Sequence, residues 1–439
     1  MLINATPRLG KVNFICWNIA FFVLLIITYE FYITPIFEYT GFHANFKSMR
    51  LPISTLLVII FTLLVTLSYN EKRISMALIY LLFIFSYFPM LTLYIYDQAT
   101  SMILFYYSLF WFMMIILNKF DITLKIVKLK EHQSNAIRWF LFVITLITII
   151  YMLFFVYRLK FSFQIFSLLS PDLYETRALA KVSTEGLFAY IANWIVKIIL
   201  PLLFIYYYDK QQKLNTAILL IASLLLFMAA PIKSNLLIIP VALVLYYSYK
   251  NNSNLCRLSI KILVLSIILI LGLYLLFNLK ISDTFLNLII RRTMFTPVYL
   301  ALQYYDFFSM NDPFYFSNSI LQALVNNPYG IGPVELIAQN YYGRSFSPNN
   351  GLFGDAFAQL GYLGIFIYPI LYNLVFVAID NICKKVDKRL VLGIFVSMTN
   401  SLLNSALFTC LLTHGILVMI ILVYLVIPNN QVAYKSCMK

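Results

Sequence analysis

Charged side chains are scarce in this sequence. Asp, Glu, Lys and Arg together account for 11% of its 439 residues, whereas an ordinary soluble domain carries roughly 25%. Hydrophobic residues account for 62% of the chain. Because a water-soluble fold cannot bury that much apolar surface, the composition excludes a soluble globular protein. It predicts that lipid is the solvent for most of the chain.

Residue types that hold metals or disulfide bridges are also few. The three histidines lie far apart, and the cysteines show no pair spacing. The five cysteines are Cys16, Cys256, Cys383, Cys410 and Cys437. We therefore expect no disulfide framework and no metal site.

The sequence also lacks a repeat of fixed period and any low-complexity tract. A long polar interval occurs only in its second half. Many secondary transporters are built from two inverted repeats, so this asymmetry weakens a transporter of that kind.

Long apolar runs fill most of the chain. About twelve of them reach the roughly 17 to 23 residues that a helix needs to cross a bilayer. They lie near 13–34, 51–69, 75–96, 101–118, 137–157, 187–208, 214–230, 234–249, 260–279, 363–380, 390–407 and 409–427. The first run lacks the small-residue cleavage site of a secretory signal, so we expect it to stay as a membrane helix. The pattern predicts an all-α integral membrane protein.

The net charge is +15, and the basic residues form short clusters between the apolar runs. This arrangement follows the positive-inside rule and favours membrane orientation over nucleic-acid binding. It predicts that both termini are cytoplasmic. The smaller share of basic residues falls in outer segments: Lys47, Arg50, Arg158, Lys160, Arg177, Lys181, Lys233, Lys280, Arg291, Arg292 and Arg344. The outer arginines depart from the rule, which makes them candidates for binding an anion.

The longest interval between apolar runs defines the expected organisation. Residues 1–280 would hold about nine transmembrane helices and a short outer loop at 158–186. Residues 281–362 would form one large outer loop, and residues 363–439 about three more helices with a cytoplasmic tail. Connecting segments on a rigid scaffold often carry binding and chemistry, so we expect the site in the large loop.

Arg291 and Arg292 precede Thr296-Pro297, which has the composition of a helix cap and a first helical position. The exposed N–H groups of such a helix start, together with a guanidinium, would suit a phosphate or diphosphate. The alternative is an arginine pair that contacts lipid headgroups.

Downstream of this position, Tyr299, Gln303 and Asp306 recur at helical spacing and should share one face. Tyr341 and Arg344 lie in another aromatic stretch of the loop. Aromatic clusters suit stacking against sugar rings, although they are also common at membrane interfaces.

Asp355 is the lone carboxylate of the segment from Asn349 to Gly361. Asn350 could cap a helix over 352–360, and Gly351 and Gly354 would allow a ligand to approach closely. A carboxylate beside an apolar wall can act as a general base. The alternative is an acidic residue that the dipole of its own helix stabilises.

Three further ionisable residues carry open alternatives. Arg177 could bind an anion, or could pair with Glu175 or Asp172. His414 lies within the last apolar run, where an ionisable group is costly and often functional, or could be a neutral imidazole packed on a polar neighbour. Lys197 lies within another run and could extend to the interface or pair.

Three motifs in the large loop resemble a known family. They are Arg-x4-Pro from Arg292 to Pro297, Tyr-Tyr-Asp-Phe-Phe from Tyr304 to Phe308, and Asn-Gly-x-Phe-Gly-Asp-x-Phe-x-x-x-Gly from Asn350 to Gly361. With the span order, they resemble the bacterial O-antigen or capsule repeat-unit polymerases of the Wzy type.

The resemblance implies an inner-membrane glycosyltransferase whose helical fold is related to that of the C-type glycosyltransferases. Its donor and acceptor would be oligosaccharides linked to undecaprenyl diphosphate at the periplasmic face. It would need no cofactor, and a chain-length regulator is a possible partner. Nucleic acid is not an expected partner.

The resemblance also implies roles for the outer residues. Arg292, Arg291, Arg177 and Arg344 would stabilise the charge on the leaving diphosphate. Asp355 is the first candidate for the base, with His414 or Asp306 in reserve. The residues expected to contact sugar are Tyr299, Gln303 and Tyr341.

Three other functions compete with a polymerase. An O-antigen ligase would share its fold and donor but usually uses a histidine in the large loop, and residues 281–362 contain none. A lipid-linked oligosaccharide flippase should show more charge within the spans. A scaffold role would leave the outer arginines unexplained.

Overall fold

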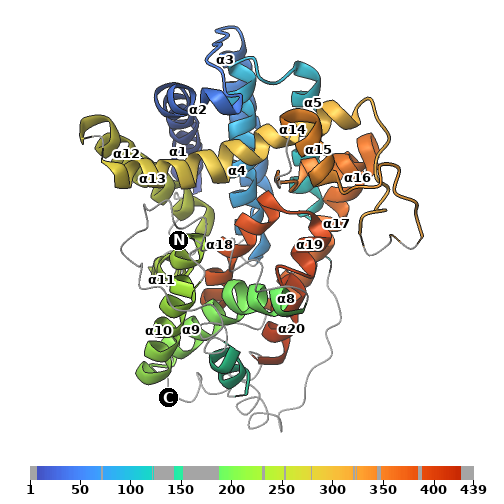
Figure 1. Ribbon diagram of the computed structural model, residues 1–439. Coiled ribbons are helices and arrows are strands. Elements are labelled where there is room, and N and C mark those ends of the chain that lie inside the picture. Colours follow the sequence, from blue (N-terminus) through green and yellow to red (C-terminus); the bar gives the residue numbers. More distant parts are fainter. Residues whose placement is uncertain are drawn as a thin grey trace. The chain divides into compact units, whose positions relative to one another are not determined.

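The computed structural model describes residues 7–70, 73–120, 122, 143–151, 187–229, 233–251, 254–277, 279–319, 322, 324–343, 348–383 and 388–426. Every regular element within these ranges is helical (Figure 1). The prediction of an all-α protein is therefore confirmed for the described part of the chain.

Several of these helices are long and apolar enough to cross a membrane. There are 7 among the described residues: Val12–Thr40, Arg50–Ser68, Ser75–Ile95, Tyr190–Asp209, Leu255–Phe277, Phe353–Cys383 and Leu407–Tyr424. Shorter apolar helices occupy Ser101–Leu117, Lys213–Leu225 and Ile238–Tyr247. These helices establish a membrane-embedded protein, while the count of about twelve spans stays a prediction. The expected run at 137–157 lies mostly outside the described residues.

The chain forms two compact units. Unit 1 contains Met1–Ile122, Asn254–Val377 and Asn400–Leu407, and unit 2 contains Thr123–Ser253, Ala378–Thr399 and Phe408–Lys439. The large interval at 281–362 thus belongs to the same unit as the first helices of the chain.

Unit 1 is built around one buried helix. Its elements are α1 Pro7–Thr28, η1 Tyr29–Ile33, α2 Thr34–Phe37, η2 Glu38–Thr40, α3 Arg50–Ser68, α4 Ser75–Ile95, α5 Ser101–Leu117, α12 Leu255–Phe277, α13 Lys280–Leu286, η6 Asn287–Phe295, α14 Thr296–Phe308, α15 Pro333–Tyr342, α16 Phe353–Leu360, η7 Gly361–Leu363 and the larger part of α17 Gly364–Cys383. Nearly every residue of α4 is buried, as expected for a helix that is apolar all round. The helices α1, α3, α5, α12 and α14 pack against it.

The segment 280–308 is one continuous helix whose middle part, η6, has π-helical hydrogen bonding. Figure 1 shows it in yellow, crossing α4 and ending beside α15 and α16. The expected helix start at Thr296-Pro297 is therefore wrong. Thr296 has helical dihedrals, its side chain caps nothing, and its N–H bonds to the carbonyl of Arg291.

Proline explains this π-helical stretch. Pro297 has no N–H, and in an α-helix its ring would collide with the carbonyl four residues earlier. The wider π-helical turn before Pro297 lets the helix continue past it. Consequently no free helix N-terminus lies beside Arg292, and the expected contribution of exposed N–H groups to an anion site is lost.

Unit 2 contains two irregular helices. The helix over 187–209 has a π-helical stretch in its middle, and the helix over 407–426 is broken. Its elements are α8 Leu187–Trp194, η5 Ile195–Ile199, α9 Leu200–Asp209, α10 Lys213–Ala229, α11 Lys233–Asn251, most of α18 Lys388–Asn404, most of α19 Leu407–Leu411, and α20 Ile416–Val426. The expected last span at 409–427 is broken between α19 and α20. Gly415 has a positive φ of 81° there, and a Cβ on it would lie 2.9 Å from the ring of Trp194.

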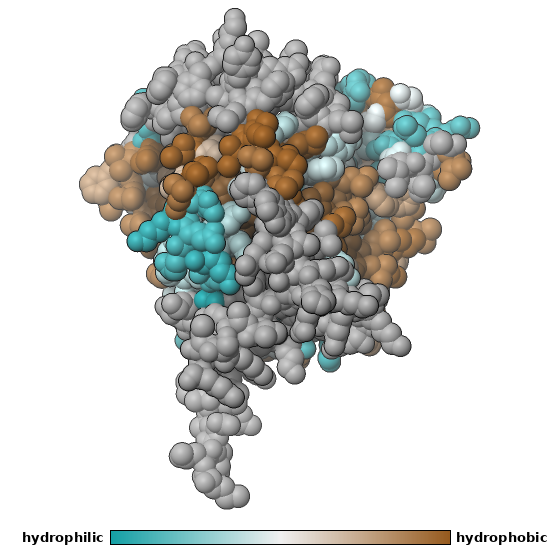
Figure 2. Space-filling view, turned by 90° about the horizontal axis from the view of Figure 1, so that it is seen from below, coloured by the Kyte–Doolittle hydropathy of each residue, from teal (hydrophilic) through white to brown (hydrophobic). Residues whose placement is uncertain are grey.

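The exposed face of α3 is apolar. Ile53, Leu56, Ile60, Leu63 and Leu67 are exposed at spacings of three and four residues. Such a stripe would be unfavourable in water, and its spacing places it on one side of the helix. Apolar residues, in brown, cover much of the described surface in Figure 2. Lipid contact accounts for both observations.

A matched pair of substitutions in α3 tests lipid contact. Val58 is fully buried, so Val58→Trp should overpack the core and cost about 1 to 3 kcal/mol of unfolding free energy. Ile60 is exposed, so Ile60→Trp should cost less than about 0.5 kcal/mol. Thermal unfolding of the purified protein in detergent measures both. Equal losses would mean that another protein surface covers the Ile60 face.

Candidate functional site

The polar face of α14 is joined to α15 by two hydrogen bonds. Gln303 Nε2 donates to Tyr342 Oη at 3.0 Å. Tyr341 Oη donates to Asp306 Oδ2 at 2.5 Å. The expected stripe thus lies on one helical face, and its partners come from the loop segment that also contributes Tyr341. We call this set, Tyr299, Gln303, Asp306, Tyr341 and Tyr342, the α14–α15 face.

Local sequence explains why α15 lies there. Pro333 stands in its first turn, where a missing N–H costs nothing. Gly343 ends the helix with a positive φ of 60°, which glycine adopts readily. The helix between them buries Leu336, Ile337 and Ala338. This burial directs the last turn, with Tyr341 and Tyr342, toward α14.

Tyr299 extends the α14–α15 face toward the end of the first span. Its ring lies 5.0 Å from that of Phe42. It also packs so closely on Gly41 that a Cβ there would collide with the Tyr299 hydroxyl. Gly41 has a positive φ of 102°. The sequence pattern did not predict Gly41, Phe42 and Tyr342; the first expected span ends at 34, and the structure extends it to Thr40, directly before Gly41.

Tyr299 and Tyr341 of this face stay neutral. Burial, with the nearby Tyr342 phenol, raises the pKa of Tyr299. Burial and the hydrogen bond to Asp306 raise the pKa of Tyr341 well above its usual value. Both phenols can therefore donate hydrogen bonds but cannot act as bases near neutral pH. Asp306 is exposed and is the carboxylate of the face.

Two of the four candidate arginines lie in η6. Arg291 donates from Nε to Asn287 Oδ1 at 2.8 Å, and its guanidinium lies 4.2 Å from the ring centre of Phe37. Arg292 is exposed and belongs to the same continuous helix as the α14–α15 face. Arg177 and Arg344 lie outside the described residues.

Asp355 is buried, with 1% of its surface exposed. Its Oδ2 accepts the N–H of Leu407 at 2.8 Å. Its Oδ1 has no donor at hydrogen-bonding geometry among the described residues, and neither do the buried hydroxyls of Tyr304 and Tyr368. Both tyrosines lie within electrostatic reach of Asp355. Burial and this carboxylate raise the pKa of Tyr304 well above its usual value.

The predicted helix after Asn350 is confirmed as α16, but the expected cap is wrong. Leu352 holds the cap position with a positive φ of 47°, and no side chain caps the helix. Gly351, next to this position, allows another segment of the protein's own backbone to approach closely. A Cβ on Gly351 would lie 2.4 Å from backbone atoms of Leu402 and Leu403. This proximity gives Gly351 a packing role in place of the close ligand approach expected from the sequence.

His414 belongs to unit 2, in the break between α19 and α20. Lys197 Nζ, from the π-helical stretch η5, lies 2.9 Å from its Nδ1. An ammonium group can only donate, so the imidazole accepts through Nδ1. Trp194 supports the break by donating from Nε1 to the carbonyl of Leu412 at 2.7 Å.

In the part of the chain that the structure describes, no group of three or more His, Cys, Asp or Glu side chains could hold a metal ion. The exposed groups of the α14–α15 face are instead the Asp306 carboxylate and the Tyr341 phenol, while the Gln303 amide is buried. Such groups form hydrogen bonds to hydroxyls and stack on apolar ring faces, which is the chemistry that a sugar offers.

Comparisons with protein-family models, with curated proteins and with solved structures found no match.

Asp355→Ala tests whether this carboxylate stabilises the fold. The change leaves the buried N–H of Leu407 without its acceptor, which should cost about 1 to 3 kcal/mol of unfolding free energy. Asp355→Asn keeps an acceptor oxygen and should lose less. Asp306→Ala, at an exposed position, is the matched control and should change stability by about 0.5 kcal/mol or less. Denaturant or thermal unfolding in detergent measures all three, and equal losses for Asn and Ala would contradict the role of the acceptor.

Proposed function

We propose that this protein is a membrane glycosyltransferase that polymerises oligosaccharide repeat units linked to undecaprenyl diphosphate. The product would be O-antigen or a related surface polysaccharide, made at the periplasmic face of the bacterial inner membrane. The α14–α15 face carries this proposal, because it presents sugar-binding groups on the same continuous helix as the exposed Arg292.

The membrane character of the chain supports a lipid-linked substrate. A polyprenyl diphosphate stays in the bilayer, so an enzyme that uses it must reach the interface from within lipid. We propose about twelve spans, cytoplasmic termini and a helical fold like that of the C-type glycosyltransferases. The segment 281–362 would then lie on the periplasmic side.

Arg292 is the proposed ligand of the diphosphate. A guanidinium presents a fixed fork of donors that matches two phosphate oxygens. Arg291, at the next position toward the N-terminus, donates from Nε to Asn287 Oδ1 and lies against the ring of Phe37; it would add positive charge near the diphosphate. Arg177 and Arg344 would add positive charge from two loop segments.

The α14–α15 face is the proposed site for sugar. Asp306 would accept hydrogen bonds from sugar hydroxyls, and Tyr341 would supply an aromatic surface. Gln303 is buried and would hold Tyr342 in position beside the sugar. The hydrogen bonds to Tyr341 and Tyr342 hold both polar side chains in place before a ligand arrives. Such preorganisation lowers the ordering cost of binding.

The proposed step is a single displacement. An acceptor hydroxyl attacks the anomeric carbon of the donor sugar, and the bond from that carbon to the diphosphate oxygen breaks. The bonding pair leaves with undecaprenyl diphosphate, whose growing charge Arg292 would stabilise. The proton of the hydroxyl passes to a carboxylate.

Asp306 and Asp355 are the two carboxylates proposed for this proton. Asp306 is exposed, whereas Asp355 is buried and bonded to Leu407. A sugar hydroxyl can reach Asp306 without any change in the fold. Its exposure therefore favours Asp306 as the base, and its burial gives Asp355 a supporting role.

Arg292→Ala should lower the rate of polymerisation more than tenfold, because an ionic contact to the leaving group is lost in the transition state. The assay incubates purified protein with an undecaprenyl-diphosphate-linked repeat unit and resolves the polymer ladder. Lys280→Ala is the matched control, because it removes one exposed positive charge from the start of the same continuous helix. A loss under tenfold for Arg292→Ala at normal protein level would remove Arg292 from this role.

A lipid-linked oligosaccharide flippase is the second candidate, favoured by the Lys197–His414 pair. Ionisable groups within spans often mark transport pathways, and broken helices often line them. This pair joins a π-helical stretch to a helix break.

Deletion of the gene separates the two candidates. For a polymerase, the surface polysaccharide should collapse to core with one repeat, because transfer and export continue. For a flippase, core should carry no repeat and single lipid-linked units should accumulate inside the cell. Complementation with Lys197→Met should restore the ladder for a polymerase whose pair is structural, and should leave units inside for a flippase.

A further inference from the structure

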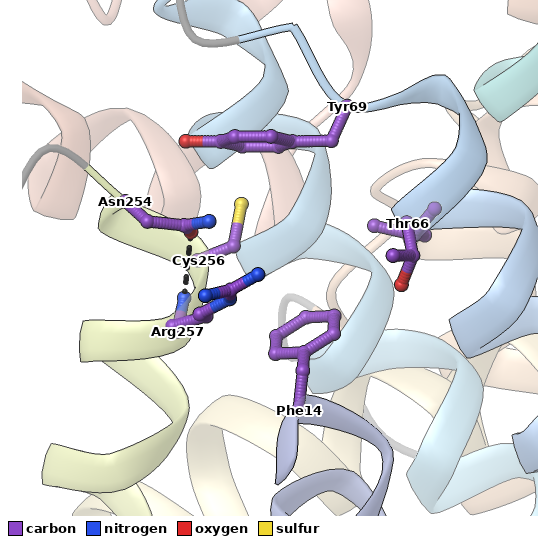
Figure 3. A pocket seen from close by; sticks show the side chains of 7 residues that line it. Phe14, Thr66, Tyr69, Asn254, Cys256 and Arg257 are labelled. Carbon is purple, nitrogen blue, oxygen red and sulfur yellow. Dashed lines mark hydrogen bonds between the residues drawn. The ribbon is translucent and has the colours of Figure 1, made fainter. Parts of the chain in front are cut away.

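A small cavity opens among the ends of α1, α3 and α12 in unit 1 (Figure 3). Its volume is about 170 Å³. Its lining residues are Phe14, Val65, Thr66, Tyr69, Asn254, Cys256 and Arg257. None of these residues belongs to the α14–α15 face, so the cavity is a separate feature of the molecule.

The cavity lies at a membrane boundary. Phe14 is near the start of the candidate span Val12–Thr40, and Thr66 is near the end of Arg50–Ser68. Arg257 is near the start of the candidate span Leu255–Phe277. Three span ends meeting at one place put the cavity at the level where lipid headgroups are found. The charge bias predicts that this side is cytoplasmic.

One end of the cavity is polar and cationic. Figure 3 shows the Arg257 guanidinium directed into the space between Phe14, Tyr69 and Thr66. No described carboxylate forms an ion pair with Arg257. Asn254 Oδ1 accepts the N–H of Arg257, which leaves the Asn254 amide nitrogen to donate to a ligand. Both groups therefore favour an anion.

The other end of the cavity is apolar. The ring of Phe14 and the side chain of Val65 form its wall and are both buried. Leu67, the residue after Thr66, is 68% exposed and begins an apolar path along α3. A ligand with an anionic head and a hydrocarbon chain would satisfy both ends, with its chain leaving over α3.

We propose that this cavity binds the headgroup phosphate of an anionic phospholipid. A cavity of about 170 Å³ has the volume of roughly five or six water molecules at ~30 Å³ each. That volume holds a phosphate with part of a glycerol but no acyl chain, which agrees with a chain that leaves along α3. Basic pockets between membrane helices on the cytoplasmic side commonly bind such headgroups.

The adjacent helical turn provides a matched control. Lys261 lies four residues after Arg257 on α12, and its Nζ stands 5.9 Å from the ring centre of Trp17. Lys261 does not line the cavity. Lys261→Gln therefore removes one positive charge from the same end of α12, as Arg257→Gln does, but leaves the cavity lining intact.

Native mass spectrometry of the full-length protein tests the proposal. Protein in detergent is mixed with equal amounts of phosphatidylglycerol and phosphatidylcholine, and the fraction carrying each lipid is measured. Wild type should prefer phosphatidylglycerol. Arg257→Gln should lower its retention by about tenfold, because a charge-assisted hydrogen bond is lost, whereas Lys261→Gln should lower it less than about twofold. Equal retention by wild type and Arg257→Gln would overturn the proposal, and so would equal losses in both variants.

Two further experiments distinguish a bound lipid from free phosphate. Val65→Phe fills the apolar end and keeps Arg257, so it should also release phosphatidylglycerol; if Arg257→Gln fails to fold, this variant decides. Inorganic phosphate is added at increasing concentration as a competitor. If it binds wild type as well as the lipid does and Val65→Phe has no effect, the site takes free phosphate and the lipid proposal is overturned.

Discussion

In lipid, every backbone N–H and C=O group needs a partner within the protein, because no water is there to supply one. This constraint shapes the ends of the helices of unit 1. Arg50 donates to the carbonyls of Tyr94 and Ala99 at the end of α4 and pairs with Asp97 at 2.6 Å. Arg73, at 6% exposure, donates from NH2 to Asn118 Oδ1 at 2.7 Å. A count of basic residues uses them only to assign the sides of the membrane. These two arginines also form hydrogen bonds with groups at the ends of helices.

The same constraint makes the long segment after α12 a rigid support. Pro297 would end an ordinary helix, yet the π-helical turns before it keep the backbone hydrogen-bonded from Asn287 to Phe295. The result is one helix that crosses the buried α4 and carries both Arg292 and the α14–α15 face. A break at Pro297 would have left these side chains on two independent elements, with no fixed distance between the proposed diphosphate and sugar groups.

Apolar length and helical spacing predicted much of this arrangement. They indicated helices throughout, the helix after Leu352, and the shared face of Tyr299, Gln303 and Asp306. They did not predict the continuity through Thr296-Pro297, because a π-helical detour depends on tertiary packing that local propensity does not encode. The hydrogen bond that the Leu407 N–H donates to Asp355 spans 52 residues. A contact of that sequence separation leaves no local pattern.

Two aspartates of the large segment, Asp306 and Asp355, illustrate how environment divides roles between identical side chains. Asp306 is exposed on α14 and accepts a hydrogen bond from a phenol, so its charge is available to a ligand. Asp355 is enclosed with the hydroxyls of Tyr304 and Tyr368 and holds the Leu407 N–H. Its acceptor oxygen ties α16 to the segment that follows α18, and α16 packs directly on α14. Asp355 thus fixes the helix that packs on α14, so in the proposed function Asp306 would act through its chemistry and Asp355 through its position.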